Sequence, residues 1–282
     1  MNPNYKIVKP IGLKEACSVV EKICVDARRF RQAKMSPCNL LIYLDSGNGR
    51  KTFARYCNDL MVRNRVLDFS GIDTMITLDF NQDNLSPFDV HDDAAIFKSE
   101  FYGIEVHTLS DKFADSCYER NLHNVYVRKT IESARTAMLL IFVPGQPGKS
   151  LERLIAGLAK EMSLENVELK TVRPDPYTVP QLAAITEREV KEKGAVVEDP
   201  TFIKRIGMLI AAKGIHTAEE ASRLGRELVF SCDYSGLVPT IKPEQLSKIA
   251  SVIKIEEMQE DKMIPAKDNV ITPIRRKTNG KG

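Results

Sequence analysis

The sequence predicts an α/β fold, in which a parallel sheet covered by helices is followed by a small all-helical unit. Short, dense apolar runs recur along the first part of the chain, and such runs are typical of strands buried on both faces of a parallel sheet. Segments of helical periodicity alternate with these runs, which favours helices that cross between parallel strands. After the Arg-Pro-Asp-Pro stretch at 173–176, the apolar residues recur only at helical spacing.

The first part of the chain supports this alternation element by element. Apolar residues recur at three- and four-residue spacing through the first helix, which Ser36 and Pro37 end: Leu13, Ala16, Cys17, Val20, Ile23, Cys24 and Ala27. The predicted elements are, in order, a helix over 12–34, a strand over 39–45, a helix over 51–62, short strands and loops within 65–93, a strand over 103–109, a helix over 112–134, a strand over 137–145 and a helix over 150–162. Residues 94–101 fit neither period.

The second part of the chain is expected to be helical. The predicted helices cover 178–193, 199–213 and 217–230, and a further helix within 239–263 has Pro243 near its start. The end of the chain is rich in Pro, Gly, Lys and Arg, which predicts a disordered basic tail. These shifts divide the chain into an α/β unit at 1–172, a helical unit at 173–236, and a C-terminal helix with its tail at 237–282.

Composition restricts the class of protein. Of the 282 residues, 43% are hydrophobic and 28% are charged, which is a globular balance, and the net charge of +3 is too small to indicate a nucleic-acid partner. No apolar run approaches the roughly 20 residues that span a bilayer, and the first residues lack the apolar core of a signal peptide. The six cysteines form no CxxC pair, and Cys17 and Cys24 share a helix face, which indicates buried thiols. We therefore expect a cytoplasmic protein that binds neither membrane nor nucleic acid.

The stretch LLIYLDSGNGRKTFARYCNDL at 40–60 has the outline of a phosphate-binding loop. Such a loop follows the pattern GxxxxGK[ST], in which glycines let backbone N–H groups approach the phosphates, the lysine reaches the β- and γ-phosphates and the hydroxyl holds Mg²⁺. Lys51 and Thr52 occupy the last two positions, whereas Asp45 and Arg50 stand where the two glycines belong. The candidate nucleotide-binding residues are Gly47, Asn48, Gly49, Arg50, Lys51 and Thr52, and Thr52 is also the candidate metal ligand.

Two questions stay open for this loop. Arg50 either clashes with the phosphate path or swings outward and adds a cation. The alternative for the whole stretch is a Gly-Asn-Gly turn between a strand and a helix that binds nothing.

The surroundings of the loop resemble the AAA+ ATPase family. KTFAR at 51–55 is similar to the start of the helix that follows the family's P-loop, and 127–155 is similar to its helix and sensor-1 strand. PYTVPQLAAI and VVEDPTFIKRI resemble the helical lid of the branch that contains red-type rubisco activase and the stage V sporulation chaperone. The resemblance covers about residues 10–250 and implies a P-loop subdomain, a lid, ATP or ADP with Mg²⁺ between them, and oligomeric rings.

The resemblance also locates the Walker B strand, where this sequence departs from the family. That strand ends in Asp-Glu, of which the Asp orients Mg²⁺ and the Glu activates water. Glu105 in YGIEVHTLSD is the candidate for the Asp, and Val106 then stands where the catalytic Glu is needed. Asp79 or Asp83 offers another register, without an adjacent acidic pair.

The remaining positions that the family uses are matched only in part. Gln146 is the candidate for sensor 1, and Arg223 or Arg226 is the candidate for sensor 2, although Glu219 occupies one alignment of that position. Only Arg153 and Lys160 lie near the place of an arginine finger, and neither has its sequence context.

These departures all remove groups that phosphoryl transfer needs, which predicts a degenerate AAA+ module. The leading hypothesis is a regulatory or scaffold subunit that binds ATP or ADP weakly or without hydrolysis, inside a homo- or hetero-oligomeric protein assembly. One alternative is an active ATPase that remodels a protein partner, and another is a nucleotide-free structural or adaptor component. The acidic segment 83–97 is interpreted as a solvated loop rather than a metal site.

Overall fold

A computed structural model describes residues 7–33, 38–64, 75–79, 103–135, 137–198, 200–232, 238–242 and 246. The expectations for 65–74, for the acidic segment 83–97 and for the basic tail therefore lie outside the described residues.

The centre of the molecule is a five-stranded parallel sheet with the strand order β2-β3-β4-β1-β5. Its strands are β1 (Asn39–Tyr43), β2 (Met75–Asp79), β3 (Gly103–Thr108), β4 (Ala137–Val143) and β5 (Leu169–Val172). Every residue of β4 is buried, because this strand lies between β3 and β1 and is covered by helices on both faces. The sheet thus confirms the parallel α/β fold that the dense apolar runs predict.

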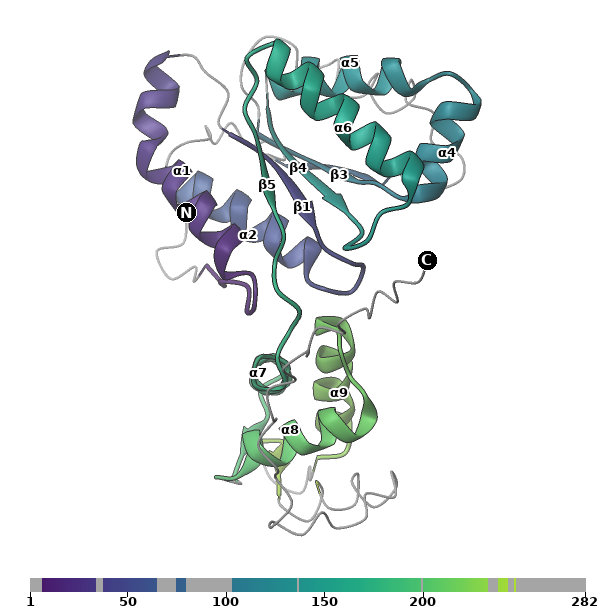
Figure 1. Ribbon diagram of the computed structural model, residues 1–282. Helices are drawn as coiled ribbons and strands as arrows, with labels where there is room; N and C mark the ends of the chain where they lie inside the picture. The colour runs from purple at the N-terminus through teal and green to yellow at the C-terminus, as the bar shows by residue number, and fades with distance from the viewer. Residues whose placement is uncertain are drawn as a thin grey trace, which may run out of the picture.

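Helices cover the two faces of this sheet (Figure 1). On one face lie α1 (Lys14–Ala33) and α2 (Arg50–Arg63), packed on side chains such as Ile42 and Leu140. On the other face lie α4 (Asp111–Glu119), α5 (His123–Ala134) and α6 (Lys149–Leu164), packed on Leu41 and Ile141. Neighbouring residues of one strand therefore belong to different cores, as the two-residue period of a strand requires.

Two features of this unit differ from the sequence prediction. The helix expected over 112–134 is two helices, because Asn121 takes a left-handed conformation with φ +55° and ends α4. Strand β5 was not predicted, since it lies at the sheet edge, where only Val172 of its four residues is buried and no dense apolar run is needed.

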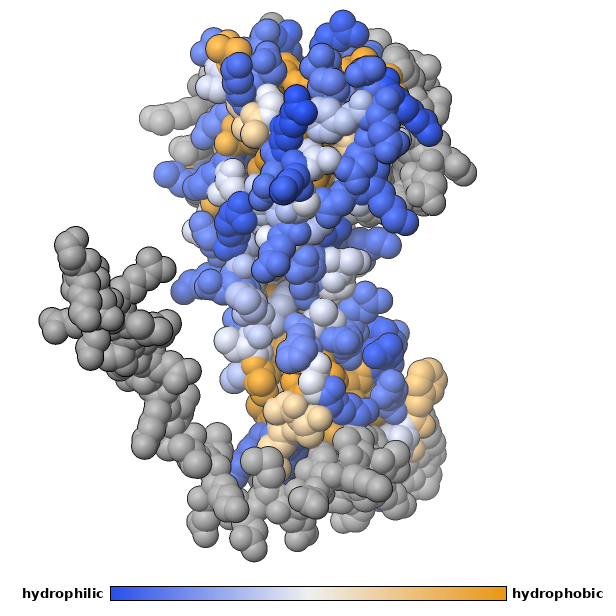
Figure 2. Space-filling view, turned by 45° about the vertical axis from the view of Figure 1, so that its right-hand side comes forward, coloured by the Kyte–Doolittle hydropathy of each residue, from blue (hydrophilic) through white to orange (hydrophobic). Residues whose placement is uncertain are grey.

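A separate helical unit follows β5 and consists of α7 (Val179–Glu192), α8 (Phe202–Lys213) and α9 (Ala218–Phe230) around its own core. It is not entirely helical, because β6 (Val196–Val197) pairs in parallel with β7 (Thr240–Ile241). Residues 240–241, at the start of the range in which a further helix is predicted, are therefore a strand, and most of 239–263 lies outside the described residues. Figure 2 shows apolar side chains gathered on this unit, and its helices carry the exposed Val179, Ile203, Met208 and Phe230.

The cysteines are buried thiols, as the sequence predicts for Cys17 and Cys24. Among the described residues, no group of three His, Cys, Asp or Glu side chains is placed to hold a metal ion. Of the helices that the structure describes, none is both long enough and apolar enough to cross a membrane.

Candidate functional site: a cationic pocket at the end of β1

The loop after β1 has the backbone shape that close approach to an anion requires. Leu44 still donates its N–H to the carbonyl of Val143, and the loop then turns at residues 45–48 and enters α2 at Arg50. Gly47 and Gly49 have φ values of +79° and +88°, where a residue with a Cβ would be strained. The two glycines that sequence alone placed out of register are thus the residues at which the loop needs glycine.

Several backbone N–H groups of this loop are left available. The N–H groups of Gly47, Gly49, Lys51 and Thr52 have no hydrogen-bond partner among the described residues. Gly49 is the N-cap of α2 and makes no side-chain cap, so the start of that helix is not closed by its own sequence. Unpaired N–H donors on a glycine-containing turn at a helix N-terminus are the donor set with which P-loops bind phosphate.

Asp45 and Arg50, the residues that replace the two P-loop glycines, are both engaged in contacts around the loop. The Asp45 carboxylate accepts a hydrogen bond of 2.8 Å from the N–H of Gly145, in the loop after β4. Arg50 donates from Nε to the carbonyl oxygen of Leu44 at 2.7 Å, and its Nη2 contacts the same oxygen. The guanidinium therefore folds back on the end of β1 while still lining the pocket described next.

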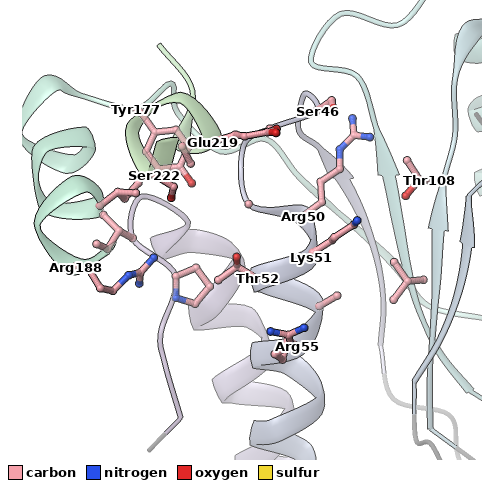
Figure 3. A pocket seen from close by; sticks show the side chains of 18 of the residues that line it. Ser46, Arg50, Lys51, Thr52, Arg55, Thr108, Tyr177, Arg188, Glu219 and Ser222 are labelled. Atoms are coloured by element: carbon pink, nitrogen blue, oxygen red, sulfur yellow. The ribbon is translucent and has the colours of Figure 1, made fainter. Parts of the chain in front are cut away.

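A cavity of about 790 Å³ opens beside the loop. It is enclosed by α2, by residues 10–11, by the pocket-facing side chains of β2 and β3, and by α7 and α9. The charged side chains among its described lining residues are Arg50, Lys51, Arg55, Arg188, Arg226 and Glu219. Figure 3 shows Lys51 extending toward the strand that carries Thr108, while Arg188 enters from α7 on the opposite side. The excess of cations over carboxylates favours a polyanionic ligand.

The helical unit is fastened to the carbonyl side of the same loop. The N–H of Glu219, in the first turn of α9, donates to the carbonyl of Gly47 at 2.8 Å, and the N–H of Ala218 donates to Asn48 Oδ1 at 3.4 Å. The hydroxyl of Tyr177, just before α7, donates to the carbonyl of Asn48 at 3.1 Å. The carbonyls of Gly47 and Asn48 therefore accept hydrogen bonds from the helical unit, while the N–H groups of Gly47 and Gly49 stay available for a ligand.

The pocket collects most, but not all, of the predicted site residues. Among the described residues, Gly47, Gly49, Arg50, Lys51, Thr52 and Arg226 line it, and Asn48 joins the loop to α9. Arg223 does not line it, because its guanidinium lies on the exposed side of α9, 3.9 Å from Glu227. Gln146 is exposed in the loop after β4 and is not a lining residue either.

Glu105 lies on the wrong face of β3 for a Walker B role, which corrects the sequence interpretation. Its side chain is fully buried, and its Oε1 lies 2.5 Å from Nε2 of His107. The other ring nitrogen of His107 lies 3.1 Å from the hydroxyl of Tyr126 on α5. Because successive strand residues face opposite ways, Val106 and Thr108 line the pocket instead.

Some pocket residues were not singled out from the sequence. Arg55 follows Lys51 by one helical turn, so helical spacing alone indicates that both share a face of α2. Tyr177 stands in the PYT turn that carried part of the AAA+ resemblance. Arg188 has no local signal, since only the packing of α7 beside residues 9–11 brings it to the pocket.

Solved structures share this fold, although no protein-family model and no curated protein matches the sequence. The Thermotoga maritima RuvB Holliday junction branch migration motor aligns with a TM-score of 0.53 and 14% identity, over 86% of this chain and 70% of that chain. C. elegans PCH-2 aligns with a TM-score of 0.53 and 11% identity, over 85% of this chain and 68% of that chain.

A third similar structure is the Aeropyrum pernix ORC1 protein in complex with DNA, with a TM-score of 0.54 and 17% identity over 89% of this chain and 68% of that chain. These neighbours are AAA+ P-loop ATPases. At such identities the similarity shows the fold alone. The chain therefore has an AAA+-like P-loop α/β fold followed by helices, as the sequence resemblance implies.

Proposed function

We propose that this chain is a degenerate AAA+ module that binds ATP or ADP without hydrolysing it at a useful rate and serves as a regulatory or scaffold subunit of a protein assembly. The observation that carries the proposal is the loop itself. Its N–H donors on Gly47, Gly49, Lys51 and Thr52 lack partners among the described residues, and they adjoin a cavity of about 790 Å³ with a cationic lining.

The side chains of the pocket explain why binding is proposed without turnover. Phosphoryl transfer depends on positioned metal ions, a group that orients water and charge stabilisation, and loss of one such group typically costs a factor of about a thousand. On the pocket face of β3 stand Val106 and Thr108, while Glu105 is buried on the other face. Arg226 of α9, the candidate for sensor 2, lines the pocket and lies 3.5 Å from Glu189 of α7.

The role in an assembly rests on the resemblance rather than on a contact. The proposal includes kinship with the branch that contains red-type rubisco activase and the sporulation chaperone. It also includes a cytoplasmic location and oligomerisation with itself or with active relatives. Two of the similar structures are, by their names, a Holliday junction motor and a protein in complex with DNA. The expectation that nucleic acid is not a partner therefore loses support, and duplex DNA belongs among the ligands tested.

A second candidate, a nucleotide-free adaptor, is favoured by the contacts of the helical unit. Tyr177 and the first turn of α9 already hold the loop through Gly47 and Asn48, with protein groups alone. A nucleotide is not required to bring the two units together. The active ATPase has no such observation in its favour and requires steady phosphate release that Lys51→Ala abolishes.

Thermal unfolding of the purified chain in titrations of ADP and ATP separates these candidates. A ligand present at 100 times its dissociation constant stabilises the folded state by about 2.7 kcal/mol, which is readily seen as a raised midpoint. Lys51→Ala should remove most of this shift, whereas Lys160→Ala, an exposed lysine of α6 outside the pocket lining, should leave it unchanged. A wild-type midpoint that does not move at high micromolar nucleotide refutes binding and leaves the adaptor.

A further inference from the structure

The two glycines of the loop lie beside different parts of the pocket wall. A Cβ at Gly49 would lie 3.4 Å from the hydroxyl of Tyr177, whereas a Cβ at Gly47 would lie 3.1 Å from Oε2 of Glu219. Tyr177 lines the pocket together with three apolar residues that adjoin or belong to the helical unit: Pro10, Ile11 and Ile185. Apolar and aromatic side chains suit a nucleotide base, so we expect the base on the side of Tyr177 and the end of the phosphate chain on the side of Gly47.

Backbone contacts hold Glu219 beside Gly47. The N–H of Glu219 donates to the carbonyl of Gly47 at 2.8 Å. The turn that carries Glu219 is fixed by a capping box between Thr217 and Glu220 at the start of α9. Glu219 is exposed, yet its Cβ lies against the loop, and Figure 3 shows its side chain extending from α9 toward Ser46. The carboxylate therefore stays close to the start of the loop even when its outer torsions rotate.

The carboxylate of Glu219 places negative charge where a longer phosphate chain would end. An ionised carboxylate and an ionised phosphate both only accept hydrogen bonds, so they repel each other and form no bond in return. Arg50 also lies at this end of the loop and donates from Nε to the carbonyl of Leu44. So does Asp45, whose carboxylate accepts the N–H of Gly145. Arg50 can balance only one of these two carboxylates.

We propose that Glu219 makes the pocket selective for a nucleoside diphosphate over the corresponding triphosphate. This inference rests on the proposed nucleotide binding and adds which nucleotide is held. Both ligands place their first two phosphates on the N–H donors of the loop and beside Lys51, but only the triphosphate extends a further anionic group toward Glu219. A bound diphosphate has no γ-phosphoryl group to transfer, which agrees with a subunit that does not turn over.

The test is calorimetric titration of the full chain with ADP and with ATP, both in one buffer with excess Mg²⁺. Because solvent screens the exposed Glu219, the wild-type chain should bind ADP more tightly than ATP by only roughly fivefold. Glu219→Gln should abolish this preference by strengthening ATP binding, since the amide is neutral and the backbone N–H to Gly47 is kept. Glu227→Gln is the matched control, because Glu227 is exposed on the same helix outside the pocket lining, and it should leave the preference unchanged.

Charge reversal at the same position extends the test. Glu219→Lys replaces the repelling carboxylate with a cation, so it should make ATP the tighter ligand. A side chain that only holds α9 against the loop would instead change the affinities for ADP and ATP by the same factor in both variants.

Each outcome decides between the two proposals. Tighter binding of ADP by the wild-type chain, lost in Glu219→Gln and kept in Glu227→Gln, supports the inference. Equal affinity for the two nucleotides, tighter binding of ATP, or a preference for ADP that survives Glu219→Gln overturns the inference but leaves nucleotide binding in place. An absence of binding of both nucleotides refutes the proposed function, and the inference falls with it.

Discussion

Gly225 sets how closely α9 approaches α7, and replacing it with alanine tests the packing that brings α9 to the loop. A Cβ at this position would lie 2.8 Å from Cβ of Glu189 and 2.9 Å from the carbonyl oxygen of Thr186, both on α7. Non-bonded carbons settle at about 3.5 Å or more, so Gly225→Ala requires the helices to separate by about 0.7 Å. Thr186 also donates its hydroxyl across this contact to the carbonyl of Ala221 at 3.0 Å.

The expected size of the effect follows from two opposing contributions. Alanine is favoured over glycine in a helix interior by about 1 kcal/mol, whereas an extra methyl group in a closed contact costs about 1–3 kcal/mol. Gly157 in α6 is the matched control, because a Cβ there would meet nothing within 4 Å. Gly157→Ala should therefore stabilise the chain by about 1 kcal/mol, and the difference between the two variants isolates the steric cost of about 1–3 kcal/mol.

Urea unfolding followed by far-ultraviolet circular dichroism measures both variants, and hydrogen exchange assigns the loss to α7 and α9. Because the helical unit has a core of its own, local protection factors decide whether the loss lies in that unit. If Gly225→Ala raises stability as much as Gly157→Ala does, the close approach of α7 and α9 is wrong, and the placement of α9 against the loop is wrong with it.

Three other expectations concern groups outside the nucleotide question. Glu105→Ala leaves Nε2 of the buried His107 without the carboxylate that lies 2.5 Å away and should cost about 1–3 kcal/mol in urea unfolding while ADP affinity stays unchanged; lost affinity at full stability would place Glu105 in the pocket after all. Gly12→Ala puts a Cβ 2.4 Å from the Tyr177 ring at φ +83° and should cost at least about 1–2 kcal/mol, and unaltered unfolding would contradict that contact. Burial raises the pKa of Cys17 and Cys24 to about 11, so both are protonated at pH 8 and should react with a thiol reagent only after unfolding; rapid labelling of the native chain would show that these thiols are accessible.

Much of the fold could be predicted because its signals are local. Local patterns of a few residues predict several elements. The dense apolar run predicts β4, and helical periodicity predicts α1, α2 and α7. Strand β5 carried no such signal, since an edge strand buries little. The break at Asn121 depends on one left-handed residue, which periodicity does not detect.

The candidate site was predictable where it is contiguous in the chain. Gly47, Gly49, Lys51 and Thr52 were identified because a strand, a turn and a helix start follow one another directly. The Walker B assignment of Glu105 was wrong because the alternation of side chains along a strand does not show which face of the sheet each residue belongs to. The sequence predicts that Glu105 and Val106 face opposite ways, but not which of them faces the pocket.

By itself, the sequence determined the alternation of the buried strands with the amphipathic helices, the glycine-containing loop and the lysine in the first turn of the helix after it, since each depends on backbone preferences and periodicity within a short stretch. Only the tertiary structure decided that Thr77 and Thr108 line the same pocket as Lys51, that Arg188 and Arg226 reach this pocket from the helical unit, and that α9 donates a hydrogen bond to the carbonyl of Gly47. Those contacts join residues separated by tens to more than a hundred positions. Their geometry is set by how whole helices pack, which no local pattern encodes.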